Sequence, residues 1–368
     1  MAAIQTKSLW HNILEVAAPA TSGGVTTVLS VAGRGRVGVM LAHEFLAETD
    51  APPATRARLE QIVRDALAVD LIRTASLRCV LDRLAADGVP VLIMKGAALA
   101  HTCYPAPHLR PRNDDDLVVS QAAFASACTS LERQGYIAEP QASGDRVTGQ
   151  RHFARTGGGG TTHHVDLHWR LVNPAAFDDL PGFDTLAAAS VPLPGLGRHA
   201  RGFGSVHALL LACAHRVAHH TPTEDPQWLL DMHLIARTLD DRGWAEFAMQ
   251  AEQSRLAEVC ASELRRTREA FGTPVPDGVL ARLAAVTGEP TAEHLGAHDP
   301  LHVQWLNLRH AGGWRARLTL VRQHVFPPPA YMLARDRPRH PALLPWLYVR
   351  RAGVGLGRWI REARARRS

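Results

Sequence analysis

Hydrophobic residues recur at three- and four-residue steps in two long parts of the chain. Within residues 51–87 this spacing, seen at Leu59, Ile62, Ala66 and Val69, predicts one long helix. After about residue 200 the same spacing predicts helices over 205–220, 228–239, 244–253, 256–271 and 279–286. Because polar joints separate these helices, we expect an all-helical domain over residues 201–325.

Short apolar runs replace that pattern between the two helical parts. Residues 90–94 and 114–119 each predict a strand, and 150–155 and 162–170 flank the glycine run 157–160 as in a hairpin with a flexible tip. We therefore expect an α+β fold with a small mixed β-sheet over residues 89–200. The other expected parts are an N-terminal segment with helices over 1–88, the helical domain, and a proline-rich extended connector followed by a basic tail over 326–368.

Glycines near the N-terminus imitate a nucleotide-binding turn. Gly33, Gly35 and Gly38 follow a β-like segment over residues 26–31 in the order typical of dinucleotide-binding proteins. That motif also needs a second parallel strand ending in a ribose-binding carboxylate about 20 residues further on. The long helix predicted over 51–87 occupies that place, so we do not expect a dinucleotide site here.

The positive charge of the protein is concentrated at its C-terminus. The 368-residue chain is 46% hydrophobic, enough for a packed core, and carries a net charge of +6. Residues 350–368 contain seven arginines against Glu362, which accounts for all of that charge. With the remainder balanced, a nucleic-acid partner is not expected. We expect the tail to be a solvated helix, with contact to phosphate or to an anionic membrane surface as the alternative.

Cysteine spacing and hydropathy indicate the compartment. The five cysteines show no paired spacing, so neither a zinc ribbon nor a disulfide framework is expected. The chain has no run of about 18 apolar residues, and its apolar stretch over 16–32 contains polar residues and follows Glu15, unlike a signal peptide. We therefore expect a cytoplasmic protein without a membrane span.

Acidic residues in the second predicted strand have the spacing of a metal site. Side chains alternate between the faces of a strand, so Asp114 and Asp116 share one face about 7 Å apart while Asp115 points away. Two carboxylates this close repel each other unless a cation lies between them. Oxygen ligands with no nearby thiolate favour Mg²⁺ or Mn²⁺.

A third carboxylate lies in the hairpin. Alternation over residues 163–170 places Asp166 on one face with His164 and His168. Three carboxylates sharing two metals can position a triphosphate, activate a hydroxyl and neutralise the leaving pyrophosphate, which is the chemistry of nucleotidyl transfer. Alternatively, His164, Asp166 and His168 could bind zinc or manganese in a metal-dependent hydrolase.

The first predicted strand ends in a candidate phosphate site. Lys95 and Gly96 lie where this strand passes into a helix, whose N-terminal amides favour an anion. Glycine permits close approach and lysine adds a compact positive charge. Arg110, just before the acidic strand, is expected to assist in binding the nucleotide.

Several motifs together match a known family. The relevant segments are Leu92–Gly96, Arg110–Val119 and Val165–Trp169, with 210–215, 228–231 and 325–328 in the helical part. Over roughly residues 58–350 the chain resembles the uncharacterised bacterial nucleotidyltransferase family of the DNA polymerase β-like superfamily. This resemblance implies that Asp114 and Asp116 are the metal pair, Asp166 the third carboxylate, and Lys95 with Gly96 the phosphate turn. It also implies either substrate contact or a buried structural role for His215, Trp228 and Asp231. Asp115 stands where an apolar residue is usual, which predicts a more exposed strand.

The leading functional prediction is a magnesium- or manganese-dependent nucleotidyltransferase. It would move a nucleoside monophosphate from a nucleoside triphosphate to a hydroxyl acceptor, with Asp166 as general base. The resemblance implies that the acceptor is a small molecule, a sugar or a peptide. The alternatives are the hydrolase described above and a non-catalytic scaffold that binds nucleotide.

Overall fold

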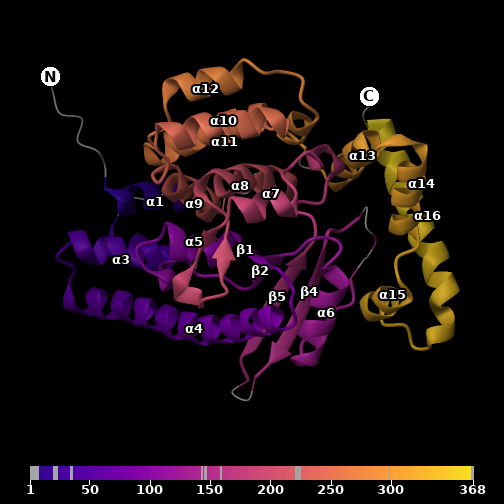
Figure 1. The fold of residues 1–368 in the computed structure, drawn as a ribbon, viewed down its shortest axis with the longest axis horizontal. Coiled ribbons are helices and arrows are strands. Elements are labelled where there is room, and N and C mark those ends of the chain that lie inside the picture. Colours follow the sequence, from indigo (N-terminus) through magenta and orange to yellow (C-terminus); the bar gives the residue numbers. More distant parts are fainter. Residues whose placement is uncertain are drawn as a thin grey trace.

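The fold is described here from a computed structural model (Figure 1). The structure describes residues 8–19, 24–33, 36–141, 144, 147–157, 160–219, 225–297 and 299–365. Gly158 and Gly159 of the predicted hairpin tip lie outside these ranges, as do Arg366 and Arg367 of the basic tail.

A mixed sheet of seven strands forms the centre of the described chain. Its spatial order is β3-β4-β5-β2-β1-β7-β6. The strands are β1 (Leu92–Met94), β2 (Asp115–Val118), β3 (Ile137–Ala138), β4 (Gln150–Thr156), β5 (Thr162–His168), β6 (Val191–Pro192) and β7 (Arg201–Gly202). β4 and β5 form the predicted antiparallel hairpin, and β2 lies between β1, its antiparallel neighbour, and β5, its parallel neighbour. The predicted α+β fold with a small mixed sheet is confirmed.

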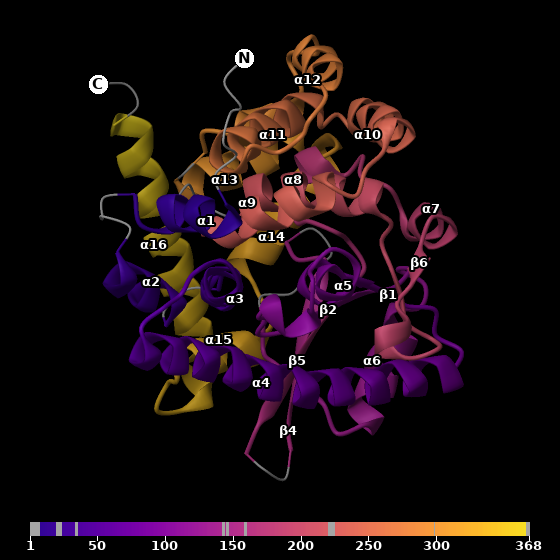
Figure 2. The ribbon, with the colours of Figure 1, turned by 90° about the vertical axis from the view of Figure 1, so that its left-hand side faces the viewer.

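Among the described residues, four N-terminal helices precede the sheet. They are α1 (Leu9–Ala17), α2 (Val25–Ala32), α3 (Gly38–Glu48) and α4 (Pro53–Ala86). The long helix α4 crosses in front of β4 and β5 in Figure 2, and its second half packs Leu77, Val80 and Leu84 into a core shared with the strands. The β-like prediction for residues 26–31 is wrong. Val28 and Ala32, four residues apart, are both buried in α2, which is the helical period.

The predicted helical domain lies on the other side of the molecule in Figure 1. Its helices are α8 (Ser205–His219), α9 (Pro226–Ala236), α10 (Asp241–Gln253), α11 (Ala257–Phe271) and α12 (Asp277–Ala284). These agree with the predicted helices to within a few residues. In the part of the chain that the structure describes, three shorter helices lie between the strands: α5 (Lys95–Thr102), α6 (Phe124–Arg133) and α7 (Phe183–Ala188). The hydrophobic core of the helical domain is continuous with residues from α1 and α3, such as Ile13 and Leu41.

The C-terminal part is also helical. It consists of α13 (Pro300–His310), α14 (Gly313–Val325), α15 (Pro329–Asp336) and α16 (Leu344–Ala365), with α14 and α16 at one edge of the molecule (Figure 1). The extended connector predicted around Pro328 and Pro329 is wrong, because α15 begins at Pro329. Proline is well accepted in the first turn of a helix, where its missing N–H leaves no bond unmade. Within the described ranges every helix is too short or too polar to span a bilayer.

Candidate active site

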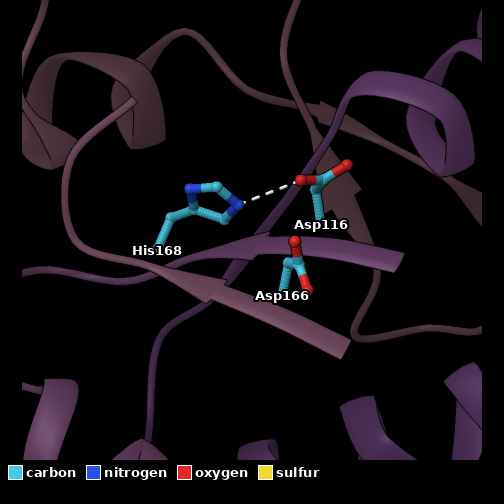
Figure 3. Close-up of side chains that lie close together, drawn as sticks. All are labelled: Asp116, Asp166 and His168. Atoms are coloured by element: carbon cyan, nitrogen blue, oxygen red, sulfur yellow. Dashed lines mark hydrogen bonds and ion pairs between the residues drawn. The ribbon is translucent and has the colours of Figure 1, made fainter. Parts of the chain in front are cut away.

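Two aspartates stand opposite each other on the central strands. β2 and β5 run parallel, and their register pairs Asp116 with Asp166. Paired residues project from the same side of a sheet, so the two buried carboxylates are neighbours. Figure 3 shows both converging with His168. The ligand atoms of these three side chains lie within 4.8 Å of one another, so the group could hold a metal ion.

Asp116 has two partners in this group of side chains. Lys95 Nζ lies 2.7 Å from Asp116 Oδ1, and His168 Nε2 lies 2.9 Å from the same oxygen. Burial alone would raise the pKa of Asp116, but the charge of Lys95 and the hydrogen bond from His168 hold it well below its usual value. Burial, and after it the charge of Lys95, lowers the pKa of His168. Asp116 is therefore an ionised carboxylate held by an ammonium group and a neutral imidazole.

Asp166 has its own partners on the hairpin strand β4. His152 Nδ1 bonds Asp166 Oδ1, and Gln150 Nε2 donates to Oδ2 at 3.2 Å. The hydrogen bond to Asp166 is the main reason that the pKa of His152 is raised, against the effect of burial. The spacing of residues within one strand does not point to His152. The register of the hairpin would have predicted the contact between His152 and Asp166, because pairing Thr156 with Thr162 across the tip places His152 opposite Asp166.

Asp114, predicted as a metal ligand, lies just before β2 and is exposed. Protein still surrounds much of the side chain, and this partial burial raises its pKa. The charges of Asp116 and Asp166 raise it further, so the carboxylate lies within reach of their field. It is not among the three side chains that converge within 4.8 Å. Its role as a metal ligand stays a prediction.

Asp115 points to the opposite side of the sheet, as alternation predicts. Its buried carboxylate accepts hydrogen bonds from Arg112 Nε at 2.8 Å and from His163 Nε2 at 2.7 Å. Arg112 Nη1 also donates to Asp70 on α4 at 2.6 Å. Burial would raise the pKa of Asp115, but His163 and Arg112 lower it. The expectation of a more exposed strand is wrong, because these partners neutralise Asp115 inside the protein.

The predicted phosphate turn lies next to the aspartates. Lys95 is the first residue of α5, directly after β1, and its φ of +53° is in the left-handed region that only glycine adopts readily. Strained backbone of this kind is concentrated at functional sites. Gly96 is buried beside Arg110 and Arg112. In this structure Lys95 contacts Asp116, and phosphate binding by Lys95 and Gly96 stays a prediction.

Arg110 connects the segment before β2 to helix α9. Its side chain is 3% exposed, and Nε and Nη2 each lie 2.7 Å from an oxygen of Asp231 on α9. Tyr104 donates to Asp231 Oδ1 at 2.6 Å, and Gln227 donates to Tyr104, also at 2.6 Å. Nη1 of Arg110 donates to the carbonyl of Pro111. With every guanidinium nitrogen engaged, the structure shows a connecting role, and phosphate contact by Arg110 stays a prediction.

The remaining residues of the helical-domain motif lie near Lys95. His215 on α8 and Trp228 on α9 have ring centres 5.2 Å apart. Together with Lys95 and Asp231 they line a cavity of about 20 Å³ between α5 and the helical domain. That volume is close to what one water molecule needs. Asp231 therefore has a visible structural role, while substrate contact by His215 and Trp228 stays a prediction.

His164, the third member of the alternative hydrolase site, lies apart from the converging side chains. It is half-exposed, and its nearest acidic partner is Glu139, with Nδ1 and Oε1 4.0 Å apart. In the group of possible metal ligands, Asp116 takes the place that the hydrolase hypothesis gave to His164.

Comparison with known proteins agrees with the motif pattern. A family model described as uncharacterised nucleotidyltransferase matches residues 22–272. No curated protein matches the chain. The crystal structure of JHP933 from Helicobacter pylori is 14% identical with a TM-score of 0.33, over 66% of this chain and 93% of that one. A second H. pylori protein, provisionally described as a nucleotidyltransferase, is 15% identical with a TM-score of 0.33, over 65% of this chain and 95% of that one. Neither structural likeness is strong enough to support a conclusion.

The family match spans more than half of the chain and confirms the resemblance, so the protein belongs to the family of uncharacterised nucleotidyltransferases.

Proposed function

We propose that the protein transfers a nucleoside monophosphate from a nucleoside triphosphate to a hydroxyl acceptor and releases pyrophosphate. The observation that carries the proposal is the pairing of Asp116 with Asp166 on adjacent parallel strands, with Lys95 beside them. Family membership supports the reaction class.

The converging donors fit a divalent cation. Asp116 and Asp166 offer oxygen ligands and His168 an imidazole nitrogen, a set that suits magnesium or manganese. Asp114, just before β2, is the candidate for an additional oxygen ligand. When bound, the ion supplies charge neutralisation on the triphosphate and activation of the attacking oxygen.

The side chains of the protein accept the proton of the acceptor hydroxyl and bind the triphosphate. The acceptor oxygen forms a bond to the α-phosphorus, and the bond from that phosphorus to the bridging oxygen of the β-phosphate breaks, so pyrophosphate leaves with the electron pair. Asp166 takes the hydroxyl proton, and its hydrogen bonds to His152 and Gln150 fix the carboxylate in position. Lys95 supplies positive charge for the triphosphate from its place next to Asp116.

The test is a search for product with matched variants. The purified protein is incubated with each α-labelled nucleoside triphosphate, magnesium and a metabolite extract, and the products are identified by mass spectrometry. Asp116→Asn and Asp166→Asn should each lower turnover by at least about 100-fold, because each removes charge from the group that holds the metal. Asp82→Asn, an exposed position on α4, is the control and should retain full activity. Full activity in Asp116→Asn would contradict the proposal.

Two other outcomes identify the alternatives. About one equivalent of tightly bound zinc in the purified protein, with activity that survives Asp114→Asn, would favour the hydrolase. Triphosphate binding without pyrophosphate release, under conditions where every candidate acceptor is present, would favour a nucleotide-binding scaffold.

A further inference from the structure

The C-terminal helices carry the positive charge of the whole chain. Residues 300–368 contain fourteen arginines and two acidic residues, Asp336 and Glu362, which gives a net charge of +12. Because the whole chain carries +6, residues 1–299 carry −6. The charge is therefore separated between two parts of the molecule, and the basic part is larger than the tail that the sequence pattern indicated.

Helix α14 is apolar on two opposite faces. Ala316 and Leu320 are buried on one face, in a small core with residues of neighbouring segments. Trp314, Leu318 and Val321 follow one another at four- and three-residue steps, so they form a stripe on the other face. All three are exposed, Trp314 by 70%. A helix that has already buried one apolar face and presents another to solvent has a second surface for a partner.

Arginines flank this exposed stripe. Helical geometry places Arg315 and Arg322, seven residues apart, along one side of the stripe and Arg317 along the other. The three arginines are exposed, and the guanidinium of Arg315 lies 5.4 Å from the ring centre of Trp314. An apolar stripe with tryptophan between rows of arginine is the pattern of helices that lie in the interface of a membrane.

Helix α16 repeats the combination at the same edge of the molecule (Figure 1). Trp346 and Val349 are exposed one helical turn apart, Val349 by 71%. Arg350 lies over the ring of Trp346 at 5.6 Å. Phe326, which follows α14, is exposed as well.

A cavity of about 740 Å³ lies between these helices. Its lining includes leucines and valines from α13, α14 and α16, among them Leu301 and Leu347, and the half-exposed Val321 belongs to both the cavity wall and the stripe on α14. Its charged lining consists of three arginines and one carboxylate: Arg335, Arg350, Arg351 and Asp336. A volume of several hundred Å³ with apolar walls and a few charged groups is typical of ligand pockets. An acidic amphiphile matches both the walls and the arginines.

We propose that the outer faces of α14 and α16 dock on the anionic surface of a lipid bilayer. The arginines complement acidic headgroups, while the tryptophans and aliphatic side chains enter the boundary of the acyl chains. Charge alone would fit RNA equally well. Exposed Leu318, Val321 and Val349 favour the bilayer, because RNA offers stacking surfaces for aromatic rings but nothing comparable for aliphatic side chains.

Co-sedimentation of the full-length protein with vesicles tests this surface. Vesicles of phosphatidylcholine mixed with phosphatidylglycerol should bind the protein, and vesicles of phosphatidylcholine alone should not. Arg315→Gln with Arg322→Gln should lower the partition coefficient about 20-fold, since each arginine near an anionic surface contributes a factor of about five. Trp314→Ser with Leu318→Ser should lower it at least about 10-fold through the lost apolar insertion.

Matched controls lie in the acidic part of the chain. Arg58→Gln with Arg242→Gln, and Leu71→Ser, change exposed side chains of the same types and should leave the partition coefficient within about twofold of wild type. Far-UV circular dichroism verifies each fold, and the arginine pair carries the test if the Trp314 pair does not fold. Equal binding to both kinds of vesicle, or to neither, would overturn the proposal. Binding to an RNA homopolymer that the arginine pair abolishes, without vesicle binding, would also overturn it.

Discussion

Replacing Asp231 by asparagine should destabilise the protein far more than removing a surface ion pair. The side chain of Arg110 is 3% exposed and has Asp231 as its carboxylate partner, at 2.7 Å from each of two nitrogens. Asparagine keeps the size of the side chain and an oxygen for the Tyr104 hydroxyl, but it leaves the guanidinium charge buried without a counter-charge. Removing one partner of a buried pair typically costs about 3–5 kcal/mol, so we expect a loss of about 3 kcal/mol in the free energy of unfolding.

Urea unfolding followed by circular dichroism measures this effect. The control is Arg282→Gln, which breaks the exposed bidentate pair with Glu252 and should leave the free energy of unfolding almost unchanged, because solvent screens such pairs. The double variant Arg110→Met/Asp231→Asn removes the buried charge altogether, so it should lose clearly less than the sum of the two single variants. If Asp231→Asn were no more destabilising than Arg282→Gln, Arg110 would not be a buried charge and the reasoning would be refuted.

Two further predictions concern a strained residue and a buried histidine. Both Lys95→Gly and Lys95→Ala remove the partner of Asp116. The glycine variant should be more stable than the alanine variant by about 1 kcal/mol in urea unfolding, because φ is +53° at this position and glycine adopts that angle without strain. An alanine variant of equal or greater stability would contradict backbone strain at this position. Burial, and after it the charge of Arg237, lowers the pKa of His233 from 6.5 to about 4. Between about pH 6.5 and 4 the imidazole of His233 is protonated in the unfolded chain but not in the folded protein. The free energy of unfolding therefore falls as the pH drops through this range, and His233 accounts for about 2 kcal/mol of the loss at pH 5. His233→Gln should remove that share of the loss in urea titrations at pH 7.5 and pH 5, and an unchanged pH dependence would exclude His233 as its source.

Local periodicity predicts the parts of the site that depend on one strand at a time. The two-residue repeat places Asp115 and Asp116 on opposite faces of β2, and the partners of these two residues confirm this division. Asp114, which the repeat assigns to the face of Asp116, lies just before the strand, and its shared role stays a prediction. The same repeat places Asp166 and His168 on one face of β5. The helices over residues 53–86 and 205–284 follow for the same reason, since each buries one regularly spaced face.

The spacing of residues within one strand or helix does not predict which distant segments of the chain contact each other. Lys95 meets Asp116 because the antiparallel register of β1 and β2 pairs Met94 with Asp116, and a shift of one residue would turn the side chains to the other face. Arg110 and Asp231 are separated by 121 positions, so only the packing of α9 against the loop before β2 brings them together. The prolines around Pro329 predict an extended connector because proline is disfavoured in the interior of a helix. Proline is also common in the first turn of a helix, and Pro329 begins α15.

The ammonium group beside Asp116 gives the acidic centre a counter-ion that belongs to the chain itself. Small metal-dependent domains often stay unfolded until their ion arrives, because only the ion can hold their ligands together. Here Lys95 and His168 already hold Asp116, while His152 and Gln150 hold Asp166. Since both carboxylates already have partners within the protein, we expect the chain to fold whether or not a divalent cation is bound at this pair.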